Sequence, residues 1–528
     1  MTETTAAPRP LTIADILEAM ADTIPDRIAV QTIDRSYTFA EIDERATRLA
    51  NRLVALGVEP GDHVAVHAPN RIEWIDAFYG CLKARAVPIN INYKYKHDEL
   101  AYLYGNADCV AAIIAPEFVE MVQALDLPDL RQLLVLDDSY ETELAAASPV
   151  RQVTGRSADD HYVLYTGGTT GNPKGVVWRN EDVVKAALNA SRFGAPIESV
   201  EALAAEAAAN EGFLTLLACG PMMHGGSQWI LGNGHVAGFT VALYTEPNFS
   251  PEGILDLVQK AGVNSLTFLG DAMGRPVAEA ILAEPDRWDL SSLVAVSNGA
   301  APLSDGVRDE IRKALPGRYI LDSYGASESG ATGSRMDEGK EGPAGAPKFG
   351  VGPDVEVFDA EFRPCPVGAD GLLGRSGAVP LGYYKDPVKT AATFKEIDGV
   401  RWVIPGDFAR REEDGSVTVL GRGSVCINTG GEKVHPEEVE AVLLRHDDVF
   451  DAVVVGTAHE RWGQQVTALV QLREGVATTE EQLREHCRSL ISNYKVPKQI
   501  FFVDKVPRTP VSKVDYPASA ELAKQLVG

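Results

Sequence analysis

The amino-acid sequence predicts an α/β protein of several domains. The order of its elements indicates the class, its composition indicates a globular chain, and its length indicates the number of domains. Short runs of aliphatic and β-branched residues alternate with segments whose apolar residues recur at helical spacing. Hydrophobic residues make up 45% of the chain and charged residues 23%, which is typical of globular proteins. The 528 residues suffice for about three or four domains of roughly 150 residues each. Because strands that are connected through helices form parallel sheets, this order predicts sheets covered by helices.

The elements of the larger, N-terminal part follow from these patterns. Helical spacing extends over residues 12–54 and is interrupted at 28–38 by residues typical of strands around a turn. Strands with helical segments between them are predicted at 63–67, 110–114, 132–136, 265–269 and 293–297. The alanine-rich residues 203–210 predict a further helix.

The C-terminal part differs from the N-terminal part in the elements that its sequence predicts. Beyond about Pro364, short strands separated by turns lead to the glycines that flank Arg422. Helices are predicted after them at 436–444 and 480–490, with strands at 452–456 and 467–472. This is an α+β unit of about a hundred residues, an ordinary size for a small domain. We therefore predict an N-terminal domain of residues 1–421, a hinge at 422–424 and a C-terminal domain of residues 425–528.

The charge of the chain limits its partners. With 49 Lys and Arg against 75 Asp and Glu, the formal net charge is −26. Such a surface repels nucleic acid and anionic lipid, so no nucleic-acid partner is expected. An anionic ligand must therefore be held by a local site, built from backbone N–H groups and a few cationic side chains.

The cysteines and the N-terminal residues indicate in which cellular compartment the protein is expected. The six cysteines are scattered without a C-x-x-C pair, which argues against a disulfide framework or a thiolate zinc site. The N-terminus lacks the pattern of a signal peptide, and no apolar stretch approaches the roughly 18 residues of a membrane span. The expected location is the cytoplasm, with no integral membrane segment.

A glycine-rich loop, Tyr165-Thr-Gly-Gly-Thr-Thr-Gly-Asn-Pro-Lys-Gly175, is the strongest local signal. Adjacent glycines let successive N–H groups converge on an anion, the threonine hydroxyls add donors, and Lys174 supplies a cation. These features suit a polyphosphate. The loop is not a Walker A motif, because Pro173 precedes the lysine and Gly175 follows it.

A second glycine pattern, Gly232-Asn-Gly-His-Val-Ala237, has the spacing of a dinucleotide-binding fingerprint. It leads into the β-branched and aromatic residues 239–244 and does not precede a helical pattern, so a pyrophosphate would find no helix N-terminus. We predict a structural turn at 232–237.

Further motifs follow the glycine-rich loop in a fixed order. They are Pro221-Met-Met-His-Gly225, Asn298-Gly-Ala-Ala-Pro302, Asp322-Ser-Tyr-Gly-Ala-Ser-Glu328, Gly382-Tyr-Tyr-Lys-Asp386, Pro405-Gly-Asp407, Gly421-Arg422 with Gly430-Gly-Glu-Lys-Val434 and Pro436-Glu-Glu-Val-Glu440, and Pro507-Arg-Thr-Pro-Val-Ser-Lys513. Together they resemble the adenylate-forming enzymes, which include acyl-CoA synthetases, luciferases and peptide-synthetase adenylation domains. The bacterial ligases for very-long-chain and steroid side-chain carboxylates are the most similar group. The resemblance implies a large N-terminal domain of parallel-sheet subdomains plus a distorted barrel, and a small mobile α+β C-terminal domain.

The resemblance also implies an acid–thiol ligase that uses ATP, Mg²⁺ and coenzyme A. A carboxylate would attack the α-phosphate of ATP to give acyl-AMP and pyrophosphate, and the thiol of CoA would then give the thioester and AMP. A bulky hydrophobic acid is expected, either a long-chain fatty acid or a steroid side-chain carboxylate. The alternatives are loading of a carrier protein, ligation of an aryl acid, luciferase-type oxygenation, and ATP binding without turnover. The oligomeric state stays open, a homo-oligomer included.

The first half-reaction joins two anions, so donors and cations are needed where charge accumulates. The resemblance assigns Mg²⁺ to Glu328, a hydrogen bond with the α-phosphate to Ser327, and a bridge between the carboxylate and the phosphates to Lys513. It assigns the β and γ phosphates to Thr166, Gly167, Gly168, Thr169, Thr170, Gly171 and Lys174. Glu328 fits this role because hard oxygen ligands suit Mg²⁺. The expected catalytic residues are Lys513, Glu328, His224 and Lys174.

The resemblance also implies which residues contact the nucleoside and the acyl group. Tyr324 is expected to stack on adenine, Asp407 to accept both ribose hydroxyls, and Arg422 to contact the ribose. The remaining residues expected around adenine are Asn298, Gly299, Ala300, Asp322, Ser323 and Gly325. His224 is expected to gate the acyl tunnel, and Trp229, Met273 and Ala326 to shape it, with core packing as the alternative for Trp229. Ser424 and Ser512 depart from the family pattern near the hinge and the terminal lysine.

Overall fold

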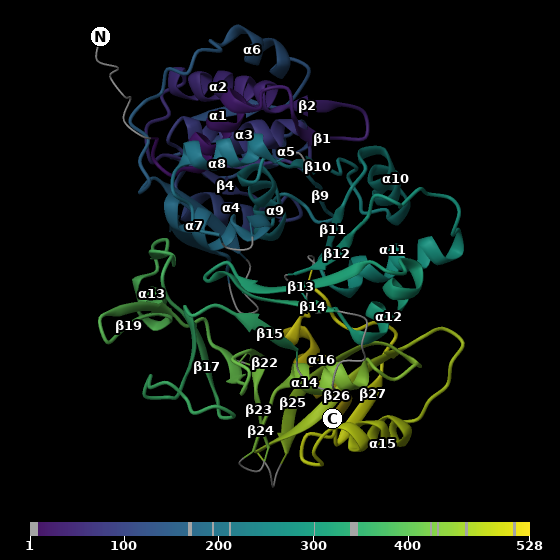
Figure 1. The fold of residues 1–528 in the computed structure, drawn as a ribbon. Coiled ribbons are helices and arrows are strands. Elements are labelled where there is room, and N and C mark those ends of the chain that lie inside the picture. The colour runs from purple at the N-terminus through teal and green to yellow at the C-terminus, as the bar shows by residue number, and fades with distance from the viewer. Residues whose placement is uncertain are drawn as a thin grey trace.

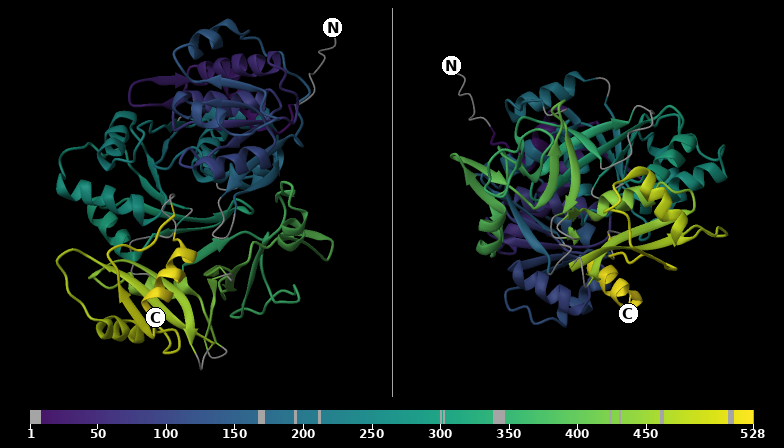
Figure 2. Two further views of the ribbon diagram at one scale, coloured as in Figure 1. Left: turned by 180° about the vertical axis from the view of Figure 1, so that it is seen from behind. Right: turned by 90° about the horizontal axis from the view of Figure 1, so that it is seen from below.

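The computed structural model describes residues 9–166, 172–192, 195–210, 213–299, 301, 303–337, 347–422, 425–429, 432–459, 463–509 and 514–527. The N-terminal elements α1 (Ile13–Thr23) and α2 (Phe39–Ala55) lie at one end of the molecule. The C-terminal sheet lies at the other end (Figures 1 and 2). The α/β class with a smaller α+β unit at the C-terminus is confirmed.

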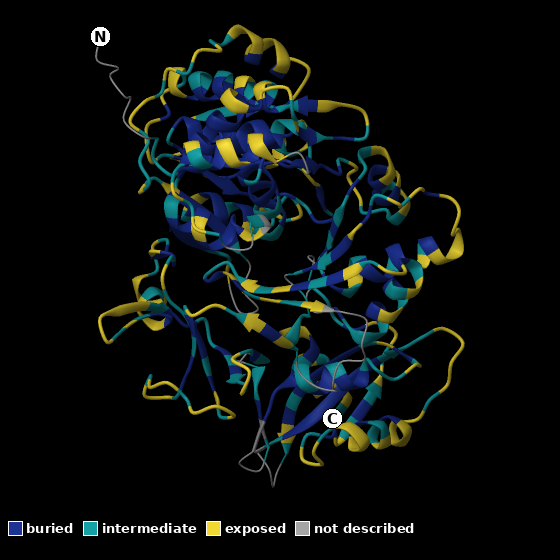
Figure 3. Ribbon diagram, viewed as in Figure 1, coloured by how far each residue is buried: buried dark blue, intermediate teal, exposed yellow. Residues whose placement is uncertain are grey.

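The first sheet is entirely parallel, as the sequence predicts. Its order is β4-β3-β5-β6, formed by Val87–Asn90, His63–His67, Cys109–Ile114 and Gln132–Val135. The helices between and after these strands are α3 (Ile72–Lys83), α4 (His97–Asn106), α5 (Pro116–Gln123) and α6 (Tyr140–Ala146). Strands β3, β4 and β5 are almost fully buried (Figure 3), which is why they consist of near-continuous apolar runs, whereas β6, at the edge, is mostly half-buried.

A long mixed sheet forms the centre of the molecule. Its parallel half has the order β1-β10-β9-β11-β12-β13, formed by Ile28–Gln31, Thr240–Ala242, Thr215–Ala218, Ser265–Phe268, Ala295–Asn298 and Tyr319–Ala326. Strand β2 (Ser36–Thr38) pairs antiparallel with β1 at the edge. Further helices of this region are α7 (Asn180–Ala187), α8 (Val200–Ala209), α9 (Gly225–Val236), α10 (Pro251–Ala261), α11 (Asp271–Ala283) and α12 (Asp305–Ala314).

Antiparallel strands continue the same hydrogen-bonded path beyond β13, in the region where the resemblance implies a distorted barrel. In spatial order they are β14 (Gly330–Asp337), β15 (Lys348–Val351), β22 (Val417–Arg422), β21 (Asp407–Arg411), β17 (Asp370–Arg375), β20 (Val400–Val403) and β19 (Phe394–Ile397). Strand β16 (Val355–Phe358) pairs with β17, and helix α13 (Pro387–Thr393) precedes β19. This antiparallel run is joined through β13 to the parallel half of the sheet.

A small antiparallel sheet, β18-β8-β7, carries the glycine-rich loop. Strands β7 (His161–Thr166) and β8 (Lys174–Arg179) form a hairpin, and β18 (Gly382–Tyr383) pairs with β8. The loop is therefore flanked by two antiparallel strands, whereas a Walker A loop is flanked by a strand and a helix.

The C-terminal sheet has the order β24-β23-β26-β25, with β27 against β26. Its strands are Glu432–Val434, Ile427–Thr429, Gly463–Leu472, Val449–His459 and Gln499–Phe502. Its helices are α14 (Pro436–Leu443), α15 (Glu480–Leu490) and α16 (Tyr516–Val527). Between Arg422 and Ile427 the chain leaves the long sheet and enters this one, and the domain boundary predicted at 421–425 stays a prediction.

Side chains of the C-terminal unit contact helices α11 and α12. Arg473 Nη2 lies 3.2 Å from Glu310 Oε1, and Arg445 pairs with Asp305. The guanidinium of Arg275, from α11, lies 4.8 Å from the ring centre of Phe450 in β25. These contacts fix how the C-terminal sheet sits against the larger part of the chain in this structure.

The prediction of a structural turn at Gly232–Ala237 is wrong, because Gly232 and Gly234 lie inside helix α9. A Cβ at Gly232 would lie 2.7 Å from Leu188 Cδ2, and one at Gly234 would lie 2.5 Å from Val241 Cγ2. The glycines thus allow the helix to pack closely on its neighbours. Tertiary packing outweighs the low helix propensity of glycine at these positions.

Candidate active site

The ends of the β7–β8 hairpin are held in place by paired side chains. Thr166 lies opposite Lys174 in the strand register, and Asn90 exchanges hydrogen bonds of 2.8 Å with the N–H and carbonyl groups of Tyr165. The Lys174 ammonium lies 2.9 Å from Asp386 Oδ2. The expected phosphate-binding residues Gly167, Gly168, Thr169, Thr170 and Gly171 lie outside the described residues.

Glu328 lies next to this hairpin. The Tyr383 hydroxyl donates a 2.8 Å hydrogen bond to Glu328 Oε1, and the indole N–H of Trp178, in β8, donates a 3.0 Å bond to the carbonyl of Ser327. In the part of the chain that the structure describes, the Glu328 carboxylate makes no ion pair. Glu328, the predicted metal ligand, therefore lies beside the small sheet that contains Lys174, the predicted phosphate-binding lysine.

Asp386 neutralises Lys174. The backbone N–H of Lys389 and the Lys174 ammonium both bind its carboxylate, and they lower the pKa of Asp386 below the usual range of an aspartate. The Asp386 side chain also caps helix α13. Lys174 is thus held at the base of the loop by a charged partner that the sequence analysis did not identify.

Asn298 ends β12 and lies opposite Asp322 of β13, where the parallel pairing of these two strands ends. Ligands bind beyond the carboxyl ends of parallel strands in α/β sheets. Asn298 accepts a 2.9 Å hydrogen bond from the N–H of Gly270 and donates a 3.0 Å bond to the carbonyl of Ala301. Its amide also lies 3.3 Å from Asp322 Oδ1. The two residues therefore tie together the ends of β11, β12 and β13.

The Asp322 carboxylate binds two guanidinium groups. Asp322 Oδ2 accepts hydrogen bonds of 2.7 Å from Arg308 and 2.6 Å from Arg335. Asp322 and Arg308 are both buried, at 4% and 3% exposed. In this structure the carboxylate stabilises the strand, and contact between this stretch and adenine stays a prediction. Gly299 follows β12 and Ser323 lies within β13 next to Asp322, whereas Ala300 lies outside the described residues.

Tyr324 and Asp407 contact each other, although 83 residues separate them in the chain. The Tyr324 hydroxyl donates a 2.8 Å hydrogen bond to Asp407 Oδ2, and the tyrosine ring lies 5.4 Å from the ring of Phe349. Asp407 is 7% exposed and begins β21, where it lies opposite Arg422 in the strand register. Side-chain facts for Arg422, and all facts for Lys513, lie outside the described residues.

Gly325 follows Tyr324 at a point of close backbone approach. A Cβ at Gly325 would lie 2.2 Å from the carbonyl oxygen of Gly330, so a side chain cannot fit there without moving the backbone. The tight β13–β14 connection that follows contains Ser327 and Glu328. Glycine at this position thus helps to set where Glu328 lies.

Two of the residues expected around the acyl group pack against different parts of the hydrophobic core. His224 precedes helix α9 and Trp229 lies within it, packed against the hydrophobic core of the N-terminal part. Met273, in α11, packs against a different core cluster, formed around β11 and β12. Ala326 ends β13, and its N–H donates a 3.2 Å hydrogen bond to Ser329 Oγ. Their assignment to the acyl site stays a prediction.

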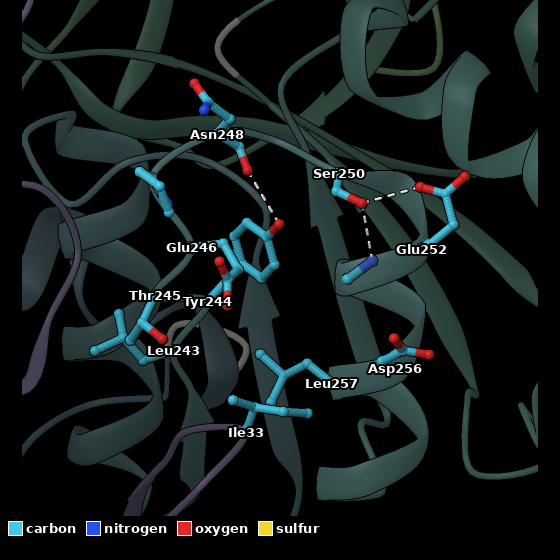
Figure 4. A pocket seen from close by; sticks show the side chains of 12 residues that line it. Ile33, Leu243, Tyr244, Thr245, Glu246, Asn248, Ser250, Glu252, Asp256 and Leu257 are labelled. Carbon is cyan, nitrogen blue, oxygen red and sulfur yellow. Dashed lines mark hydrogen bonds between the residues drawn. The ribbon is translucent and has the colours of Figure 1, made fainter.

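A cavity of about 470 Å³ lies elsewhere, between residues 243–250 and helix α10 (Figure 4). None of the predicted site residues lines it. Three of its lining residues are the acids Glu246, Glu252 and Asp256, and Ser250 donates a 2.9 Å hydrogen bond to Glu252 Oε2. Because carboxylates repel phosphate, this cavity does not suit ATP.

The AMP-binding enzyme family matches residues 17–384, and the AMP-binding enzyme C-terminal domain matches residues 438–513. The chain belongs to the AMP-binding enzyme family. The predicted membership among the adenylate-forming enzymes is confirmed by these matches.

Two curated relatives of this AMP-binding enzyme extend over nearly its whole length. The 3-oxocholest-4-en-26-oate–CoA ligase of Rhodococcus rhodochrous is 42% identical, covering 96% of this chain and 95% of the relative. A medium/long-chain-fatty-acid–CoA/3-oxocholest-4-en-26-oate–CoA ligase of Mycolicibacterium smegmatis is 41% identical over the same shares. The ATP-bound structure of MatB from Rhodopseudomonas palustris matches with a TM-score of 0.83 at 25% identity, covering 98% of this chain and 100% of MatB.

Within the described residues, this AMP-binding enzyme has no helix with the length and apolar character needed to cross a bilayer. The same residues contain no group of three or more His, Cys, Asp or Glu side chains gathered as for a metal ion. A lone carboxylate such as Glu328 nevertheless fits Mg²⁺, since this ion is commonly held by one or two carboxylates together with the phosphates of a substrate.

Proposed function

We propose that this enzyme is an AMP-forming acyl-CoA ligase. In the first half-reaction a carboxylate oxygen of the acid attacks the α-phosphorus of ATP, and pyrophosphate leaves. In the second, the sulfur of CoA attacks the acyl carbon of acyl-AMP, and AMP leaves. The proposal is supported above all by the similarity to CoA ligases over nearly the whole chain. It is also supported by the positions of Glu328 and Lys174, which both contact Tyr383 beside one hairpin.

A bulky hydrophobic carboxylate is the proposed substrate. One relative is named for a steroid side-chain acid, and the other for that acid and for medium- and long-chain fatty acids. We favour a long-chain fatty acid or a steroid side-chain carboxylate over an aryl acid for this reason. CoA is the proposed acceptor, with a carrier protein as the alternative.

At the phosphate end, the hairpin loop and Lys174 would bind the β and γ phosphates. Lys174 would exchange its contact with Asp386 for phosphate oxygens, so that the departing pyrophosphate is held by a cation. Glu328 and the phosphates would hold Mg²⁺, which supplies positive charge where negative charge develops. Ser327, next to Glu328, would donate a hydrogen bond to the α-phosphate.

At the nucleoside end, Tyr324 would stack on adenine and Asp407 would accept the ribose hydroxyls. The hydrogen bond between Tyr324 and Asp407 supports these two assignments, because it holds the carboxylate beside the ring on which adenine would stack. The buried ion pair of Asp322 with Arg308 would keep β13 in place under adenine. Arg422 would contact the ribose where the long sheet ends.

The C-terminal domain, residues 425–528, is proposed to rotate between the half-reactions and to deliver Lys513 in the first. The ion pairs that join the domains are partly exposed, with side-chain exposures of 22% for Arg445 and 45% for Asp305. Such pairs typically contribute about 0–1 kcal/mol each, so breaking them opposes rotation only weakly. The family matches on either side of residues 385–437 are compatible with a boundary at 422–424.

The cytoplasm is the proposed location. It is supported by the six cysteines, all of which are free thiols in the structure, as expected in a reducing compartment.

The decisive experiment is a screen with ATP, CoA and fatty, steroid side-chain and aryl acids. Pyrophosphate release and thioester formation are measured separately for each acid. Acid-dependent release of both products with fatty or steroid acids is expected. Pyrophosphate release without a thioester would favour a carrier-protein acceptor, and binding of ATP without acid-dependent pyrophosphate would refute the proposal.

A further inference from the structure

Tyr383 lies between two side chains assigned to the polyphosphate end of the site. Its hydroxyl donates a 2.8 Å hydrogen bond to Glu328 Oε1, and the Lys174 ammonium lies 5.7 Å from the centre of its ring. Tyr383 is buried, at 8% exposed. One aromatic side chain thus contacts both the carboxylate and the cation, and the reaction scheme gives it no role.

The backbone of Tyr383 is fixed on two sides. In β18 it pairs antiparallel with Val176 of β8, and its N–H donates a 2.9 Å hydrogen bond to Thr390 Oγ1. The preceding Gly382 has φ +151° and approaches Thr390 so closely that a Cβ would lie 2.5 Å from Thr390 Cγ2. The position of the tyrosine ring is therefore determined by the hairpin that also carries Lys174.

Asp386, at the end of the same segment, completes the environment of Lys174. Its carboxylate receives a 2.9 Å hydrogen bond from the lysine ammonium, while the tyrosine ring lies within cation–π distance of that ammonium. Residues 382–386 thus hold the lysine through two different side chains. The Tyr383 ring also contacts Phe394 edge-on, with ring centres 6.0 Å apart, which limits its rotation.

We propose that Tyr383 is a positioning residue for adenylation, which orients the Glu328 carboxylate and the Lys174 ammonium toward the metal-bound polyphosphate. The inference rests on the proposed function, since it assigns Glu328 to Mg²⁺ and Lys174 to phosphate. In this role Tyr383 contacts no atom of a substrate, and it acts through Glu328 and Lys174.

Two features of Glu328 make such orientation necessary. Its carboxylate is half-buried and, in the described part of the chain, has no ion pair to fix its rotation. A hydroxyl bound to Oε1 leaves the other oxygen to face a cation. Hydrogen-bond partners of metal-binding carboxylates commonly change metal affinity or activity by about 10- to 100-fold when they are removed.

Tyr383→Phe removes the hydroxyl and keeps the ring against Lys174. Tyr384→Phe is a matched control, because the Tyr384 hydroxyl donates its 2.8 Å hydrogen bond to Asp108, a residue outside the proposed site. Binding of ATP to each full-length protein is measured by calorimetry with Mg²⁺ and with EDTA. Pyrophosphate release and thioester formation from supplied acyl-AMP are followed separately.

For Tyr383→Phe we expect about tenfold weaker binding of Mg·ATP and about tenfold slower adenylation, at the lower end of the range for such partners. Binding of ATP in EDTA and thioester formation from acyl-AMP should stay within about twofold of the unmodified protein. The reason is that only the hydrogen bond to Glu328, the proposed Mg²⁺ ligand, is lost. Tyr384→Phe should match the unmodified protein in all four measurements.

Equal losses in Tyr383→Phe and Tyr384→Phe, or equal losses with Mg²⁺ and with EDTA, would overturn the inference in favour of a purely structural role. Unchanged Mg·ATP binding in Tyr383→Phe would overturn it as well. A different result would refute the proposed function, namely that the unmodified protein releases no pyrophosphate with any acid. The calorimetric comparison of ATP binding would still test the role of Tyr383 in that case.

Discussion

Replacing Asp407 by alanine should weaken ATP binding, because it removes the carboxylate proposed to hold the ribose. Asp407 is 7% exposed and accepts a hydrogen bond from the Tyr324 hydroxyl. Its proposed bonds to the two ribose hydroxyls form only in the complex. The Tyr324 bond forms without nucleotide. We expect it to persist in the complex, so that its loss affects both states and largely cancels in the binding free energy.

The expected magnitude follows from the charge on the acceptor. A hydrogen bond to a charged group contributes about 1.5–3 kcal/mol, and in Asp407→Ala water can replace part of what is lost. A net loss in this range, about 1.5–3 kcal/mol, corresponds to about 10- to 150-fold weaker binding. Binding of ATP should be measured at equilibrium without acid, since a KM equals a dissociation constant only when chemistry is slow.

Tyr324→Phe is the matched control. It removes the hydroxyl that binds Asp407 and keeps the ring proposed to stack on adenine. Because the lost hydrogen bond does not involve the nucleotide, ATP binding should change by less than about 0.5 kcal/mol, below the usual range for a neutral hydrogen bond. Thermal unfolding of both variants shows whether the fold is retained. A folded Asp407→Ala protein that binds ATP as tightly as the unmodified enzyme would refute the ribose assignment.

The remaining predictions concern Lys513, which is the proposed catalytic lysine, Gly421, which precedes the proposed hinge, and the effect of pH. Lys513→Ala should abolish pyrophosphate release while thioester formation from supplied acyl-AMP continues; equal loss of both activities would contradict its role. Gly421 has φ +117°, and a Cβ there would lie 2.1 Å from Glu437 Oε2, so Gly421→Ala should lower the free energy of unfolding by about 1–3 kcal/mol. Gly415→Ala, at φ +83° with open space around it, should cost less in the same denaturant titration. Burial, and secondarily the charge of Glu437, raises the pKa of Glu440 from 4.5 to about 8. Glu440 therefore favours folding while protonated, and this stability is lost as pH rises from about 4.5 through about 8. Glu440→Gln should flatten the fall in stability over that window, and an unchanged pH profile would argue against a neutral Glu440.

Much of the fold could be predicted because its signals are local. Helix α15 has the predicted bounds Glu480–Leu490, and β3 has the predicted bounds His63–His67. Thr479 caps α15 with a capping box, a signal that depends on residues three apart. The helix at Gly232 and Gly234 could not be predicted in this way, because the packing against Leu188 and Val241 that stabilises it comes from distant parts of the chain.

The same distinction applies to the site. Glu328, Lys174 and Asp407 could be named from the sequence because each lies in a motif with its own spacing. Tyr383 also lies in a motif, but its role depends on neighbours 55 residues away at Glu328 and on the opposite strand at Lys174. Likewise, the two guanidinium groups on Asp322 come from a helix and from a neighbouring strand.

The sequence by itself determined the family, the α/β class and the identity of most residues proposed to bind ATP, since these depend on residue types at short, fixed spacings. Only the tertiary structure decided which of these residues contact one another, and which buried partners hold them. Hydrogen bonds and ion pairs act over a few ångströms in space, and the distance along the chain between two contacting side chains does not limit them.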